Sequence, residues 1–186
     1  RRDYSQSMTI RGVLRMSRRA HAQSFMLPFA VTILVPIAVL FLTSWLPSWL
    51  LLFPLSFLAV PLSIVLIIGG FYLLAHTIKM FARIGQGTLA PWSPPQKLVV
   101  QGIYLHMRNP MIAGVLLILL GESILFGSIW LYLWFLLCLI MNHFYFIKSE
   151  EPGLVKRFGD EYLRYAENVP RWIPRRAPWD SSSEDV

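Results

Sequence analysis

The sequence predicts an all-α integral membrane protein, with about four transmembrane helices in two tight hairpins and a cytoplasmic C-terminal amphipathic helix. Three observations support this fold class. Apolar residues make up 55% of the 186 residues, a larger share than in ordinary soluble domains. Four apolar stretches have about the length that a helix needs to cross a bilayer, roughly 20 residues. The positive charges avoid the two shortest connections between these stretches.

The four predicted spans pair into hairpins because their connections are short. Residues 26–46 and 53–78 form the first pair, joined by "PSWLL". Residues 111–126 and 128–147 form the second pair, joined by "GS". The third stretch is short for a span, so we expect it to run across the bilayer with little tilt.

The distribution of positive charge predicts the orientation. The 17 Lys and Arg residues all lie in the N-terminal segment, the loop between the hairpins and the tail. With four spans these three segments share one side, and the excess of Lys and Arg indicates the cytoplasm, so both termini are expected there. The same distribution argues against a nucleic-acid partner, and the net charge of +7 is interpreted as orientation plus attraction to anionic lipid.

These boundaries divide the chain into six segments. They are a basic cytoplasmic N-terminal segment (1–25), the first hairpin (26–80), a Gly/Pro-rich cytoplasmic loop (81–110), the second hairpin (111–147), a cytoplasmic tail (148–176) and a polar end expected to be disordered (177–186). Residues 8–22 are Arg-rich and favour a helix lying on the membrane surface. The chain starts at Arg1 rather than Met, so we expect either further residues upstream or a processed N-terminus.

The tail is predicted to contain one amphipathic helix over residues 151–169. Leu154, Phe158, Tyr162 and Val169 recur at helical spacing, and Pro152 suits a first turn. The following "PRWIPRR" ends the helix. We expect the helix to pack under the bundle or on the membrane.

Two polar stretches are predicted to meet at the cytoplasmic boundary. "QGIYLHMRNP" precedes the third span and "NHFYFIKSEE" ends the fourth, and the tight turn places both at one membrane depth. Two polar sets should therefore face each other: Tyr104, His106, Arg108 and Asn109 from the first, and Asn142, His143, Tyr145, Glu150 and Glu151 from the second. The arrangement is either a boundary salt bridge with snorkelling neighbours or a site for a water-soluble ligand.

Familiar soluble-enzyme motifs are absent from the sequence. It contains no Gly-rich phosphate loop, no His pair at i, i+4 and no serine elbow. Cys138 is the single cysteine and lies inside an apolar run, so neither a disulfide framework nor a cysteine metal site is predicted. No metal is expected.

An ordered set of motifs resembles a known superfamily. "GTLAPWSPPQ", "LVVQGIYLHMRNPM", a "GE" in the next span and "EEPGLVKRFGDEYLRYAENVPRWIP" follow one another over roughly residues 85–176. Together they resemble bacterial-type members of the isoprenylcysteine carboxyl methyltransferase and phospholipid methyltransferase superfamily. The resemblance implies a multi-pass protein of a bacterial inner membrane that uses S-adenosylmethionine to methylate a lipid or amphipathic acceptor at the cytoplasmic face.

The resemblance also implies site residues. The catalytic candidates are Arg108, Asn109 and Glu151. The cofactor-binding candidates are Leu98, Gly102, Tyr104, His106, Arg108, Pro110, His143, Glu150, Glu151, Tyr162 and Arg171. Asn109 and Ile112 depart from the His and Tyr that many members carry, which weakens the transfer of a prenylcysteine substrate more than that of the cofactor.

The chemistry of these side chains suits the cofactor. Arg108 can form a fork with the carboxylate of S-adenosylmethionine, and Glu150 or Glu151 can accept from its ammonium or ribose. Methyl transfer is an in-line displacement, so the protein supplies mainly orientation and exclusion of water.

Two other functions stay open from the sequence. One is an NADPH-dependent membrane reductase, which would need a denser Arg cluster than Arg108 with Arg171. The other is a non-enzymatic membrane protein; a carrier would show matching broken helices in two halves, and the two hairpins here are unlike each other.

Within the spans, Glu122 is expected to be either a neutral, hydrogen-bonded structural residue or part of the acceptor site. Small residues are expected to allow close helix packing: Gly114 and Gly121 in the third span, and Gly69 and Gly70 in the second.

Overall fold

The computed structural model describes residues 28–43, 56–84 and 98–180. The predicted surface helix at 8–22, the turn of the first hairpin, the loop at 85–97 and the last six residues lie outside this described part. All regular structure within it is helical, in agreement with the predicted class. The elements in chain order are η1 (Ala30–Leu34), α2 (Val35–Thr43), α3 (Ser56–Ile84), η3 (Gly102–Leu105), α4 (Pro110–Leu125), α5 (Ile129–Tyr145), η4 (Phe146–Glu150), α6 (Glu151–Phe158) and α7 (Asp160–Asn168).

Two of the described helices are long and apolar enough to cross a membrane. They cover Phe57–Met80, with 24 residues, and Ile129–Phe158, with 30 residues. The apolar helices Ala30–Thr43 and Pro110–Leu125 are shorter. The outer faces of the long helices expose large apolar side chains, including Val65 and Tyr72 of α3 and Leu133 and Ile140 of α5, as expected of helices that face lipid.

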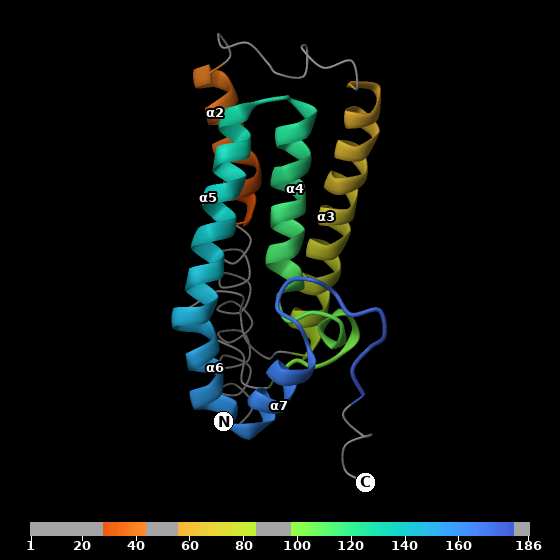
Figure 1. Ribbon diagram of the computed structural model, residues 1–186, viewed down its shortest axis with the longest axis vertical. Coiled ribbons are helices and arrows are strands. Elements are labelled where there is room, and N and C mark those ends of the chain that lie inside the picture. Colours follow the sequence, from red (N-terminus) through yellow and green to blue (C-terminus); the bar gives the residue numbers. More distant parts are fainter. Residues whose placement is uncertain (1–27, 44–55, 85–97, 181–186) are drawn as a thin grey trace, which may run out of the picture.

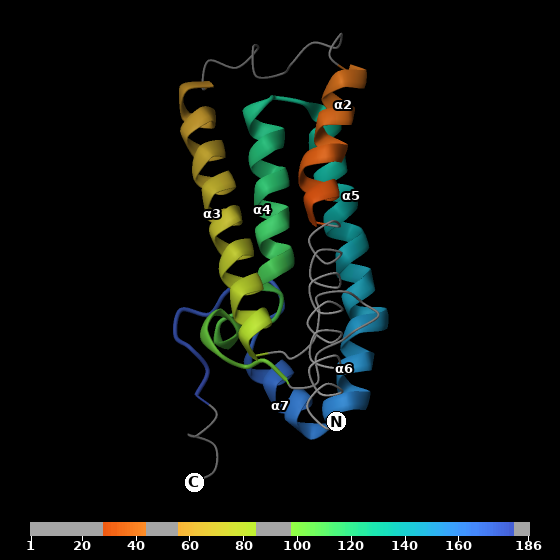
Figure 2. The same cartoon turned by 180° about the vertical axis from the view of Figure 1, so that it is seen from behind.

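Helix α4 lies between α3 on one side and α5 with α2 on the other (Figure 1, Figure 2). Glycines let α3 and α4 approach closely. A Cβ on Gly70 would come within 2.6 Å of the Gly114 carbonyl oxygen, and one on Gly121 within 2.9 Å of the Ser63 carbonyl oxygen. The predicted packing role of Gly70, Gly114 and Gly121 is therefore confirmed. The same expectation for Gly69 is wrong, because nothing lies within 4 Å of a Cβ built there.

The other face of α4 packs on α5. Val115, Leu116 and Leu119 form a buried cluster with Cys138 of α5, so the lone cysteine is a core residue. The connection between the two helices is tight, as predicted. Gly127 adopts a φ of 56°, which glycine tolerates without steric cost, and the Ser128 hydroxyl caps α5 by accepting from the Leu131 amide at 3.4 Å.

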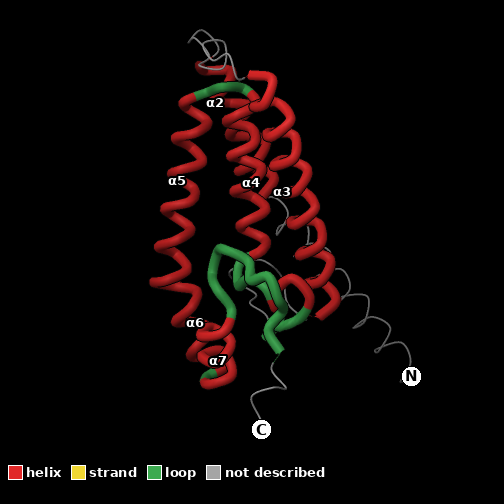
Figure 3. Tube along the Cα trace, turned by 45° about the vertical axis from the view of Figure 1, so that its right-hand side comes forward, coloured by secondary structure: helices red, strands yellow, loops and turns green. Residues whose placement is uncertain are grey.

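The predicted single tail helix is wrong in its boundaries. α5 does not stop at the membrane boundary but continues through the π-helical η4 into α6. The helix then breaks at Gly159, whose φ of 55° and ψ of −131° belong to a region that glycine alone adopts readily. α7 starts after this break in a new direction (Figure 3), so two short helices replace the expected one.

The tail folds back under α4 and is fixed there by two sets of contacts. Tyr162, Tyr165 and Val169 form a buried cluster that includes Leu98 from the connecting segment. Residues 105–108 pair with the chain beyond α7 through backbone hydrogen bonds: Arg108 N to Pro170 O at 2.9 Å, Arg175 N to His106 O at 2.9 Å and Trp179 N to Leu105 O at 3.0 Å. The tail therefore brings its polar residues to the start of α4.

Candidate active site

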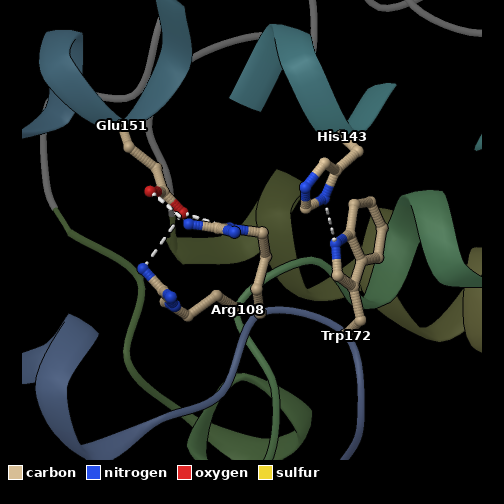
Figure 4. A network of polar contacts seen from close by, with 5 residues as sticks. Arg108, His143, Glu151 and Trp172 are labelled. Atoms are coloured by element: carbon tan, nitrogen blue, oxygen red, sulfur yellow. Dashed lines mark hydrogen bonds and ion pairs between the residues drawn. The ribbon is translucent and has the colours of Figure 1, made fainter. Parts of the chain in front are cut away.

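Three charged side chains from separate elements form one ion-pair network, part of which is labelled in Figure 4. Arg108 precedes α4, Glu151 opens α6 and Arg171 follows α7. Arg108 Nη1 donates to Glu151 Oε1 at 3.0 Å. Arg171 Nε donates to Oε1 at 2.7 Å and its Nη2 to Oε2 at 2.8 Å. Glu151 thus holds two guanidinium groups side by side, one of them through a bidentate fork.

This network is largely shielded from solvent. The side chains of Arg108 and Glu151 keep 12% and 17% of their accessible surface, so the attraction between them is screened less than on an open surface. The hydrogen bond with Glu151 raises the pKa of Arg171. Two arginines against one ionised Glu151 give the group a net positive charge, which suits an anionic group of a ligand.

Buried tyrosines border the network. Burial, and next the charge of Glu151, raise the pKa of the Tyr162 hydroxyl, and a hydrogen bond with Arg108 opposes that shift. The Tyr165 hydroxyl donates to the Tyr104 carbonyl oxygen at 2.8 Å. Burial also raises the pKa values of Tyr104 and Tyr165, so at neutral pH all three remain uncharged donors.

Glu150 stands beside the network, in the π-helical segment after the apolar part of α5. Burial, and next the charge of Glu151, raise the pKa of Glu150 from 4.5 to about 7. A carboxyl with this pKa exchanges a proton near neutral pH, so Glu150 is a candidate proton acceptor beside the network.

Two buried donors at the start of α4 lack partners. Arg108 Nε and Asn109 Nδ2 are shielded from solvent and make no hydrogen bond in the structure. Asn109 occupies the N-cap position of α4 without a side-chain cap hydrogen bond, which leaves its amide for another purpose. Buried donors without an acceptor are costly, and together they define a place where an oxygen atom of a ligand would be stabilised.

Four other predicted site residues lie outside the ion-pair network. His106 Nδ1 donates to the Arg175 carbonyl oxygen at 2.9 Å, so it fastens the tail. Leu98 packs in the cluster of α7. Gly102 begins η3 with a φ of 55°, next to Met80. Pro110 is the buried first residue of α4, as the sequence predicted.

The structure does not bring all of the two predicted polar sets together. Asn142 turns back to donate to the Cys138 carbonyl oxygen at 2.8 Å.

The Glu122 Oε2 atom is buried and without a hydrogen-bond partner in the structure, so the hydrogen-bonded structural role is not supported for that atom.

Sequence reasoning missed Trp172. Its indole Nε1 donates to His143 Nδ1 at 3.2 Å (Figure 4). The signal that could have found it is its position directly after Arg171 in "PRWIP", a stretch that also belongs to the family resemblance.

Comparison with known proteins places this chain in a family. The family model described as "Phospholipid methyltransferase" matches residues 58–161, more than half of the chain. The chain belongs to the phospholipid methyltransferase family. The match covers α4 and α5 and includes Arg108, Glu150 and Glu151. Residues 162–180, which supply Arg171 and Trp172, lie beyond it.

Two relatives match parts of this chain. A "Protein-S-isoprenylcysteine O-methyltransferase" of Schizosaccharomyces pombe is 39% identical over 77 residues, 41% of this chain and 33% of the yeast protein. An "Uncharacterized protein" of Haemophilus influenzae is 35% identical over 63 residues, 34% of this chain and 100% of that protein. The chain thus aligns with only a third of the yeast enzyme's length.

These similarities confirm the resemblance to the isoprenylcysteine carboxyl methyltransferase and phospholipid methyltransferase superfamily. Together with the two long apolar helices, they identify a membrane protein of a methyltransferase family. They favour neither the reductase nor the non-enzymatic alternative.

Proposed function

We propose that this phospholipid methyltransferase family member is an S-adenosylmethionine-dependent methyltransferase acting on a lipid or amphipathic acceptor at the cytoplasmic face of the membrane. The observation that carries the proposal is the pair of unpartnered buried donors, Arg108 Nε and Asn109 Nδ2, next to the network of Arg108, Glu151 and Arg171. A fully paired boundary salt bridge would leave no such donors.

The residues present fit the cofactor's polar groups. The carboxylate of S-adenosylmethionine needs a positively charged fork, which Arg108 and Arg171 offer. Its ammonium group needs an anionic oxygen, which Glu150 supplies once it loses its proton, and Glu151 retains lone pairs beyond the bonds to both arginines. Tyr162 provides a ring beside them. When bound, the cofactor supplies an electrophilic methyl group on its sulfonium.

The work of the protein's own residues is mainly positioning. Glu151 holds the two guanidinium groups in fixed directions, so the cofactor would be oriented before the acceptor arrives. The buried tyrosines and the folded tail exclude water from the site. Pro110 places the start of α4, and with it Asn109, directly above the network.

The acceptor's chemistry determines whether a base is needed. A carboxylate acceptor attacks the methyl group without losing a proton, whereas an ammonium must lose one first. When Glu151 alone pairs with the cofactor's ammonium, Glu150 is suited to take that proton, since its pKa of about 7 lies near working pH. Asn109 Nδ2 would hold an acceptor oxygen in either case.

The proposal includes the membrane arrangement. We take α3, α5 and the shorter apolar helices Ala30–Thr43 and Pro110–Leu125 as four spans. α4 is about 24 Å long at helical rise, which is enough for a thin or locally compressed bilayer. The basic segments would then face the cytoplasm, where soluble S-adenosylmethionine is available.

Transfer of a labelled methyl group tests the function. The protein is reconstituted in nanodiscs with bacterial lipid and given S-adenosylmethionine carrying a tritiated methyl group, and organic extracts are counted. We expect lipid-soluble label that Arg108→Ala reduces about a hundredfold, while the exposed Arg164→Ala on α7 leaves it unchanged. Release of volatile methanol by mild base distinguishes a methyl ester from an N-methyl product. If the wild-type protein gives no lipid-soluble label while a folded sample binds the cofactor product, lipid methylation is excluded.

A further inference from the structure

Trp172 connects the polar site with the apolar core between two membrane helices. Its backbone belongs to the tail, directly after Arg171. Its side chain, however, packs against the buried cluster of Val115, Leu119 and Cys138 on α4 and α5. Adjacent residues of one loop thus serve two environments: Arg171 pairs with Glu151, and the partly buried Trp172 ring packs on the apolar core of α4 and α5.

The indole is held in a defined orientation. Its Nε1 donates to His143 Nδ1 at 3.2 Å, which requires an unprotonated Nδ1 on the imidazole. The ring also meets Phe146 edge to face, with centroids 5.6 Å apart and planes at 81°. Both partners come from the cytoplasmic end of the α5–η4 helix. Trp172 therefore lies where the apolar core of α4 and α5 reaches the site.

A second tail tryptophan, Trp179, holds the tail at a different apolar cluster. Trp179 packs against the cluster of Tyr162, Tyr165 and Val169, with its ring centroid 6.0 Å from that of Tyr165. That cluster packs against Leu98 and Val100 of the segment before α4. Trp179 therefore holds the tail to the connecting segment, whereas the Trp172 side chain contacts the core of α4 and α5.

We propose that Trp172 determines acceptor specificity: its indole forms the end wall against which the apolar chain of the acceptor packs. This inference rests on the proposed function. An amphipathic acceptor has to put its reacting group at Arg108 and Asn109 and its chain among apolar residues of the bilayer side. Trp172 lies between these two environments, because it follows Arg171 in the chain and its partly buried side chain packs against the apolar cluster of α4 and α5.

Fluorine NMR tests this contact without turnover. The protein is labelled with 5-fluorotryptophan in phosphatidylcholine nanodiscs, and the resonances of Trp172 and Trp179 are assigned from the Trp172→Phe and Trp179→Phe variants. S-adenosylhomocysteine is added, followed by N-acetyl-S-farnesylcysteine or phosphatidylethanolamine. We expect at least one of these amphiphiles to shift the Trp172 resonance while the Trp179 resonance stays in place.

Chain selectivity supplies a second measurement. The probes are geranyl, farnesyl and geranylgeranyl cysteines and phosphatidylethanolamines with short and long acyl chains. In whichever class is methylated, Trp172→Ala should change the ratio of kcat/KM values between the shortest and longest chains by about tenfold. Trp172→Leu, which keeps an apolar side chain, should give an intermediate ratio, and Trp179→Ala should leave it unchanged.

The outcomes separate the inference from the function on which it rests. If S-adenosylhomocysteine binds but neither amphiphile moves the Trp172 resonance, the acceptor wall is refuted and the function stands. An unchanged chain-length ratio in Trp172→Ala refutes it equally. If the wild-type protein does not bind S-adenosylhomocysteine, the proposed function falls, and the inference falls with it.

Discussion

Arg171 donates two hydrogen bonds to Glu151, from Nε to Oε1 at 2.7 Å and from Nη2 to Oε2 at 2.8 Å. The two residues are separated in the chain by the whole of α6 and α7, so this fork closes the tail onto the start of α6. The same carboxylate also accepts from Arg108. Glu151 therefore joins the segment before α4, the extension of α5 and the tail at one point.

Replacing Arg171 by Lys tests the fork. Lysine keeps the charge but cannot make two parallel hydrogen bonds to one carboxylate, so we expect Arg171→Lys to lower stability by about 1 kcal/mol. We also expect a roughly tenfold weaker affinity for S-adenosylhomocysteine. Thermal unfolding and calorimetry measure the two effects, with the exposed Arg164→Lys as the matched control. Wild-type values for Arg171→Lys would show that charge alone suffices there.

Helix packing predicts opposite outcomes for two adjacent glycines. Gly70→Ala puts a methyl group within 2.7 Å of Ile118 Cγ1 and 2.6 Å of the Gly114 carbonyl oxygen, so α3 has to move away from α4. We expect a loss of about 1–3 kcal/mol in resistance to denaturing detergent. Gly69→Ala meets nothing within 4 Å and should be neutral or slightly stabilising. Equal effects of the two substitutions would contradict the observed contact face.

Glu150 predicts a pH dependence of stability. Its pKa is raised from 4.5 to about 7, so the folded protein binds a proton at Glu150 that the unfolded chain releases at lower pH. The contribution of Glu150 to stability is then fully present below about pH 4.5, falls as the pH rises towards 7 and is lost above it.

The Glu150→Gln variant should lack this contribution to the slope. Thermal midpoints measured from pH 5 to 8, relative to a Glu161→Gln variant that is exposed on α7, check the prediction. A slope equal to that of the wild-type protein would mean that Glu150 titrates normally.

His106 predicts a role in holding the tail. Its imidazole donates to the Arg175 carbonyl oxygen at 2.9 Å, and His106→Phe keeps a ring but removes the donor. We expect trypsin to cleave after Arg171, Arg175 or Arg176 about tenfold faster, because a hydrogen bond of roughly 1 kcal/mol no longer opposes local opening. His76→Phe, on the exposed face of α3, is the control. An unchanged cleavage rate in His106→Phe would indicate that the backbone pairing alone fixes the tail.

The sequence predicted those features that depend on local chemistry. Pro110 marks the start of α4 because proline is favoured in a first helical turn, and Gly114 with Gly121 marks its packing face because small residues let helices approach. The pairing of Arg108 with Glu151 followed from a short turn that sets two helix ends at one depth.

Features that depend on tertiary contacts were not predictable in the same way. Hydrophobic spacing continues through Gly159, so periodicity indicated one tail helix, whereas the backbone turns there into a conformation that only glycine adopts readily. The packing of Trp172 against the core of α4 and α5 depends on the path of the chain after α7, which no local pattern encodes. Arg171 was predicted from the resemblance, but its fork with Glu151 needed the structure.

Calorimetric titration of S-adenosylhomocysteine into detergent-purified protein tests the central claim most directly, with NADPH titrated alongside. The account predicts micromolar binding of S-adenosylhomocysteine that is lost in Arg108→Ala and in Glu151→Gln and kept in Arg164→Ala. Thermal unfolding of each variant confirms that the samples are folded. Binding of NADPH without binding of S-adenosylhomocysteine, or binding that survives both site substitutions, would contradict the assignment of this network as the cofactor site.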